Sequence, residues 1–188
     1  MIDNLTNILT DILAISTLIG FTVSIFLLIL FFLKKTKKIS TITEKLFFKN
    51  ITKISLPSAW VIATISMVTS LYYSEVAGFE ACTFCWYERI AMYPQVIILG
   101  IASWRDDFKV KIYALPLAII GMLISIYHYQ LQLFPNQSAI SCSSNASGSS
   151  IPCTGSWFLE FGFISIPFMA FTGFLLIISL LLITDRIK

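Results

Sequence analysis

Charged residues are scarce in this chain. Only 12% of its 188 residues are Asp, Glu, Lys or Arg, there is a single histidine, and 57% of the residues are hydrophobic. Soluble globular domains carry about 25% charged residues, roughly twice this share. The composition therefore excludes an ordinary soluble domain and places the chain in a lipid bilayer.

The few charged residues separate five long uncharged runs. A helix needs roughly 20 apolar residues to cross the hydrocarbon core of a bilayer, and most of the runs reach that length. The third run is short, but it becomes long enough when it is extended back through residues 86–89. We predict an all-α membrane protein with five spans, built on residues 12–33, 54–74, 90–104, 112–134 and 161–184.

Basic residues lie on one side of these predicted spans. All but one of the 13 Lys and Arg residues follow the first, third or fifth span. Because an excess of Lys and Arg marks cytoplasmic loops, we expect these segments inside the cell and the N-terminus outside. The exception is Arg89, which we expect near the outer face.

The chain is predicted to have two parts. The first span lacks the basic flank and the small-residue cleavage site of a secretory signal, so we interpret it as a retained anchor. Residues 1–49 then form an N-terminal transmembrane anchor with a basic cytoplasmic linker. Residues 50–188 form a four-span core with two loops on the outside.

All four cysteines fall in those two outside loops. Cys82 and Cys85 lie between the second and third spans, and Cys142 and Cys153 lie between the fourth and fifth. The outside is an oxidising compartment, in which disulfides persist. Four cysteines allow three pairings, and the sequence alone does not choose among them. The shared loops favour Cys82 with Cys85 and Cys142 with Cys153.

The two cysteine pairs have different surroundings. Residues 138–156 are rich in Ser and contain Gly, Asn and Pro, which predicts an exposed loop that a protein partner can reach. Cys82 and Cys85 instead abut the start of a membrane helix, where free backbone N–H groups and the helix dipole stabilise a thiolate. Arg89 follows Cys85 by four residues, so it lies on the same helical face about 6 Å further along the axis. It supplies a positive charge near that sulfur.

Each of these residues also has a structural interpretation. The Cys-x-x-Cys pair could be a plain staple or half of a metal site, but the sequence has no second such pair and no nearby histidine, so we predict no metal. Arg89 could extend to the lipid headgroups, as interfacial arginines do. His128, near the outer end of the fourth span, is either functional or bonded to a neighbouring helix.

Residues 82–94, with the sequence CTFCWYERIAMYP, resemble the signature of the DsbB-like disulfide bond formation proteins. Two further matches follow in order, at residues 128–135 and 161–167. The resemblance covers residues 50–188 and implies a four-helix transmembrane bundle. Residues 1–49 lie outside it, as one additional N-terminal transmembrane helix.

This resemblance implies an enzyme, a quinone-dependent protein thiol:disulfide oxidoreductase of the cell membrane. It would re-oxidise a DsbA-like thioredoxin-fold protein outside the cytoplasm. The electrons would pass to the membrane quinone pool, of ubiquinone or menaquinone type. The expected partners are thus that protein, quinone and the lipid bilayer, and no nucleic acid.

The same resemblance assigns a role to each candidate residue. Cys82 and Cys85 would be the pair coupled to quinone, with Cys85 giving the thiolate that contacts its ring. Arg89 and His128 would bind the quinone. The pair that exchanges with the protein partner would be Cys142 and Cys153.

The sequence departs from the family pattern in two ways. Only ten residues separate Cys142 from Cys153, and the N-terminal span is additional. An alternative is a reductase of the vitamin K epoxide reductase type, but there the loop cysteines precede the Cys-x-x-Cys pair, whereas here they follow it. A further alternative is a non-enzymatic metal-handling membrane protein.

Overall fold

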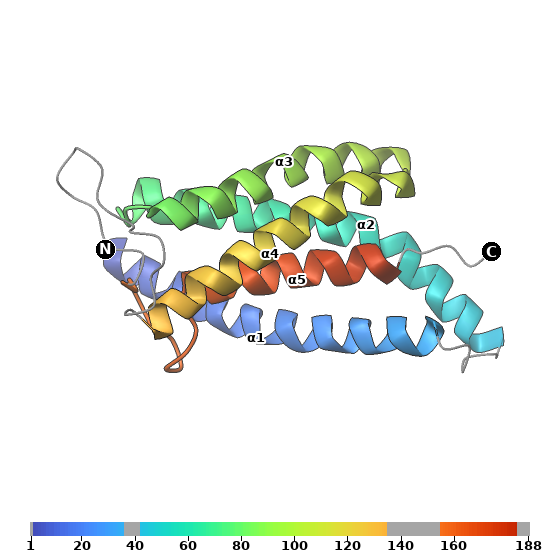
Figure 1. Cartoon of the computed structure of the whole chain (residues 1–188), viewed down its shortest axis with the longest axis horizontal. Coiled ribbons are helices and arrows are strands. Elements are labelled where there is room, and N and C mark those ends of the chain that lie inside the picture. The colour runs from blue at the N-terminus through green and yellow to red at the C-terminus, as the bar shows by residue number, and fades with distance from the viewer. Residues whose placement is uncertain (1, 36–41, 135–154, 184–188) are drawn as a thin grey trace.

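The chain folds into long helices. The computed structural model describes residues 2–35, 42–134 and 155–183 (Figure 1). A π-helical turn, η1 (Tyr72–Val76), and a short 3-10 helix, η2 (Phe108–Val110), supplement the long elements. The long helices are α1 (Ile2–Lys35), α2 (Ile42–Leu71), α3 (Thr83–Arg105), α4 (Lys111–Leu133) and α5 (Ile166–Ile183). The predicted all-α architecture with five long helices is confirmed.

Four stretches are long and apolar enough to cross a membrane. Within the described parts of the chain they are Asn4–Leu33, Ile51–Val76, Phe108–Leu133 and Ile166–Ile183. The remaining long helix, α3, is 23 residues long, as is α4. Its length therefore also suffices to cross a membrane. α3 is more polar than the other helices because it contains Glu88, Arg89 and Gln95, and these side chains are buried inside the bundle. Polar side chains inside a membrane bundle are costly and mark functional positions.

Four of the helices close a bundle. α2 packs against α3 and α5, and α4 packs against the same two helices, whereas α1 packs mainly against α5. Phe174 of α5 lies over Gly121 of α4, where an added Cβ would come within 2.3 Å of the ring atom Cζ. Only glycine therefore permits this close approach, which joins α4 to α5 at the centre of the bundle.

The additional helix α1 lies along the bundle beside α5, with its N-terminal end at the end of the molecule where α3 begins (Figure 1). Most of its buried side chains are small or carry a hydroxyl, which lets helices approach closely. Thr6 bonds the hydroxyl of Tyr72 at 3.1 Å, and Thr10 bonds that of Tyr73 at 3.0 Å. Nearer the middle of α1, the Ser24 carbonyl accepts a hydrogen bond from the hydroxyl of Ser179 on α5 at 3.4 Å.

The structure corrects the start of the predicted fifth span. The fifth span was predicted from residue 161, but α5 begins at Ile166. Phe161 and Gly162 have φ values of 51° and 82°, and this left-handed turn is incompatible with a continuous right-handed helix. The turn is closed by backbone hydrogen bonds between Glu160 and Ile164. The boundary predicted between residues 49 and 50 falls inside α2, so the linker continues into the core as helix.

Candidate dithiol active site

Cys82 and Cys85 lie together at the start of α3. Cys82 is the N-cap residue, with extended backbone (φ −69°, ψ 172°), and its sulfur accepts a hydrogen bond from the Cys85 backbone N–H at 3.4 Å. Cys85 is in the first turn, three residues later and on the same side. Both cysteines are free thiols, and their sulfur atoms are 3.2 Å apart. The Cys-x-x-Cys spacing at a helix start thus places two reactive sulfurs side by side.

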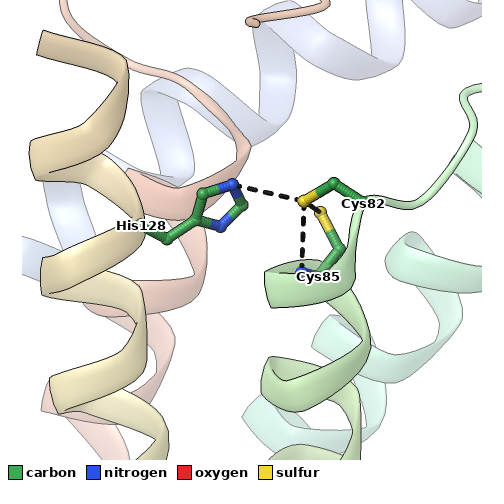
Figure 2. Close-up of side chains that lie close together, drawn as sticks. All are labelled: Cys82, Cys85 and His128. Atoms are coloured by element: carbon green, nitrogen blue, oxygen red, sulfur yellow. Dashed lines mark hydrogen bonds between the residues drawn. The ribbon is translucent and has the colours of Figure 1, made fainter. Parts of the chain in front are cut away.

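His128 reaches this pair from α4. Figure 2 shows its ring pointing at Cys82, with Nε2 3.4 Å from the Cys82 sulfur. Its other ring nitrogen, Nδ1, lies 3.0 Å from Oε1 of Glu88 on α3. Glu88 and His128 are only 6% and 2% exposed. When Nδ1–H donates to the carboxylate, Nε2 is left to face the sulfur, so the three side chains form one connected chain.

The electrostatics of this chain favour an anionic sulfur at Cys82. A hydrogen bond from the Cys85 thiol lowers the pKa of Cys82 most, and a hydrogen bond from His128 lowers it further, against the opposing effect of burial. The pKa falls from 9.0 to about 4. In the reduced protein Cys82 is therefore a thiolate at neutral pH. The sulfur that carries the charge is the one next to His128.

Arg89 extends to α2 rather than to a cysteine. Its Nε donates to the Ser70 hydroxyl at 2.9 Å, and its Nη2 donates to the Ser70 carbonyl at 3.1 Å. The guanidinium carbon also lies 5.2 Å from the centre of the Trp86 ring, a cation–π distance. These contacts hold the positive charge in one place inside the bundle.

A cavity of about 270 Å³ lies beside the dithiol, and both Cys85 and Arg89 line it. Cys82 does not line this cavity, and its sulfur contacts the imidazole of His128. Most of the other lining side chains are apolar. Among the described residues, the lining hydroxyls of Tyr93 and Thr172 have no hydrogen-bond partner. Unpaired hydroxyls in an apolar cavity are suited to bind a ligand that carries acceptor groups.

The dithiol and the imidazole also form a possible metal-binding group. The sulfurs of Cys82 and Cys85 and a ring nitrogen of His128 all lie within 4.8 Å of one another. Two thiolates and an imidazole are ligands that zinc prefers. The sequence argument against a metal was the absence of a nearby histidine, and the fold supplies one from 46 residues away. The prediction of no metal stays a prediction.

The other predicted cysteine pair falls outside the described residues. Cys142 and Cys153 both belong to residues 135–154. Their pairing and their role in exchange with a protein partner stay predictions.

The comparison with known proteins decides the family. Residues 53–184 match the family model described as disulfide bond formation protein DsbB. The chain belongs to the DsbB family. It is thus a multi-pass membrane protein of disulfide bond formation, and the family implies thiol oxidoreductase activity.

Individual relatives of the chain are also named as disulfide formation proteins. The chain is 50% identical over 126 residues to disulfide bond formation protein C of Bacillus subtilis (strain 168), across 66% of this chain and 88% of the relative. It is 47% identical over 135 residues to probable disulfide formation protein C 2 of Bacillus anthracis, across 72% and 93%. No solved structure matches the chain.

Sequence reasoning missed one residue of this site. Glu88 belongs to the quoted signature but was assigned no role, although an acidic residue inside a membrane span is a functional signal by itself. The four predicted site residues that the structure describes differ in their surroundings. His128 contacts Cys82, Cys85 lines the cavity, and Arg89 lines that cavity while bonding Ser70.

Proposed function

We propose that this DsbB-family protein is a quinone-dependent thiol:disulfide oxidoreductase. In this proposal it re-oxidises a DsbA-like thioredoxin-fold protein outside the cytoplasm and passes the electrons to the membrane quinone pool. The observation that carries the proposal is a dithiol with one of its cysteines, Cys85, on the wall of a largely apolar cavity within a membrane bundle. A thiol pair that only stapled two segments would not need such a cavity.

The cavity residues fit a quinone head group. Ligand pockets usually hold about 300–1,000 Å³, so a volume of about 270 Å³ suits a flat ring better than a whole isoprenoid quinone. A quinone ring has two carbonyl oxygens that accept hydrogen bonds. Arg89 and the unpaired hydroxyls of Tyr93 and Thr172 are donors on the cavity wall. A bound quinone supplies an acceptor for two electrons and two protons.

The two cysteines of the dithiol have different roles in this proposal. Cys85 lines the cavity, and the Cys82 sulfur lies 3.2 Å from the Cys85 sulfur, within reach of the bond that closes the disulfide. Disulfide formation removes two electrons and two protons from the pair. The proton of Cys82 has already passed to Nε2 of His128 when the thiolate forms, and Glu88 holds the imidazole in the orientation that this requires.

Exchange with the protein partner is assigned to the second cysteine pair. The partner's thiolate attacks the disulfide of Cys142 and Cys153, and a further exchange transfers the electrons to Cys82 and Cys85. Every such step is the attack of a thiolate on a sulfur, so its rate depends on the thiolate fraction and on access. This scheme requires both pairs on the extracytoplasmic side of the cell membrane, as the distribution of basic residues predicts.

The test is a reconstituted reaction. The purified full-length chain is mixed with a soluble quinone analogue and a reduced thioredoxin-fold partner, and quinone absorbance and free thiols are followed together. We expect one quinone reduced for each disulfide formed in the partner, and no turnover with Cys85→Ser. Stoichiometric zinc binding without any quinone reduction would contradict the proposal and favour metal handling at Cys82, Cys85 and His128.

A further inference from the structure

The additional helix α1 forms part of the cavity wall. Leu13, Ser16, Thr17 and Gly20 line the same cavity as Cys85 and Arg89. Their spacing of three, four and seven residues puts them on one face of the helix. The hydrogen bonds between Thr6 and Tyr72 and between Thr10 and Tyr73 hold that face against η1, which follows α2 directly.

This part of the wall lies outside the segment that matches the family. The family match begins at residue 53, beyond the end of α1 at Lys35. The match to the Bacillus subtilis relative covers 88% of that protein, and the remainder is too short to hold a helix of 34 residues. The cavity is therefore lined mainly by the segment that matches the family and is completed by a helix outside that segment.

A buried hydroxyl lies where α1 meets α5. Thr172 lines the cavity, is 3% exposed, and its hydroxyl has no hydrogen-bond partner among the described residues. Gly20 of α1 faces it closely, since an added Cβ there would lie 3.5 Å from Thr172 Cγ2. A buried hydroxyl without a partner is destabilising, and a ligand carbonyl in the cavity would supply the missing acceptor.

We propose that α1 is a fifth wall of the quinone site, and that its small side chains leave the space that the quinone head group occupies. This proposal rests on the proposed function, because it concerns the site at which that reaction takes place. Ser16 and Thr17 bond the carbonyls of their own helix. They therefore contribute shape, and Thr172 contributes a hydrogen bond.

A photoreactive quinone tests the proposal on the unmodified, full-length protein. An azidoquinone is bound, activated by light, and its attachment sites are mapped by mass spectrometry, with and without excess unlabelled quinone. We expect label on residues 13–20 as well as on α3, reduced in both by the competitor. If the competitor reduced label on the core helices and none appeared on α1, the role of α1 would be overturned and the proposed function would stand. If the competitor reduced the label at no position, both the role of α1 and the proposed function would be overturned.

A pair of substitutions on α1 gives a second, independent measurement. Thr17→Phe places a large ring into the cavity, whereas Ile15→Phe places it on the outer face, where Ile15 is 51% exposed. Affinity for a quinone analogue is measured by quenching of tryptophan fluorescence, because Trp157 lines the cavity. We expect Thr17→Phe to weaken binding by about tenfold or more, as for overpacking of a well-fitted site. Equal affinities in two folded variants would contradict the proposal.

Discussion

The chain of contacts around Cys82 makes a quantitative prediction about its ionisation. With a pKa of about 4, Cys82 is a thiolate at every pH above about 5, and the thiolate is lost as the pH falls through 4. An ordinary cysteine, with a pKa near 8.5, is only a few per cent thiolate at pH 7. The pH profile of Cys82 alkylation in the reduced protein should therefore be flat from about pH 5.5 to pH 8.

Two substitutions should shift that profile by different amounts. His128→Gln removes the imidazole, and a hydrogen bond to a charged group contributes about 1.5–3 kcal/mol, so the pKa of Cys82 should rise by about 1 to 2 units. Cys85→Ala removes the hydrogen bond that lowers this pKa most, and it should shift the midpoint further than His128→Gln does. In both variants the thiolate is lost at a higher pH than in the parent.

The assay needs a background in which only this site reacts. Cys142 and Cys153 are replaced by Ser, the protein is reduced, and iodoacetamide attachment at Cys82 is quantified by fragment-ion mass spectrometry between pH 3 and pH 9. The midpoint is informative and the absolute rate is not, because nucleophilicity falls as the pKa falls. A midpoint near 8.5 in the parent, or an unchanged midpoint in His128→Gln, would refute the reasoning.

Three further predictions follow from the same geometry. Glu88→Gln keeps an acceptor for the imidazole but removes its charge, so single-turnover disulfide formation at the dithiol should slow about tenfold, whereas Glu88→Leu should slow it more. Arg89→Ala should slow quinone reduction while exchange with the protein partner stays nearly unchanged, and equal losses in both rates would argue against its place at the cavity. Gly121→Ala, whose Cβ would overlap the ring of Phe174, should lower stability by about 1–3 kcal/mol in thermal unfolding, whereas Gly20→Ala, with ordinary contacts only, should be nearly neutral.

The helices were predictable because their signals are local. A run of about 20 uncharged residues is long enough to span a bilayer whatever surrounds it, and each of the five long helices overlaps one of the predicted runs, although α2 begins at Ile42, well before residue 54. The start of α3 was equally local, since a Cys-x-x-Cys pair followed by helix-forming residues places both sulfurs in the first turn. The start of α5 was missed because the run at residues 161–165 is as apolar as a helix but contains a left-handed turn.

The direction in which polar side chains point was not predictable. Glu88 and Arg89 follow Cys85 by three and four residues, so both share its side of the helix. The rotation of α3 in the bundle turns Glu88 toward His128 on α4 and Arg89 toward Ser70 on α2. Such a rotation depends on how all the helices pack, and a difference of one residue is too small to read from spacing.

The sequence by itself determined the membrane placement, the helical class and the reactive dithiol, because hydrophobic length and helix-start chemistry are properties of neighbouring residues. Only the tertiary structure decided that His128 meets Cys82 across 46 residues, that Cys85 faces the cavity, and that α1 completes its wall. Contacts between helices depend on their rotation and depth in the bundle. Those are set by the packing of all the helices together, for which no single segment carries the information.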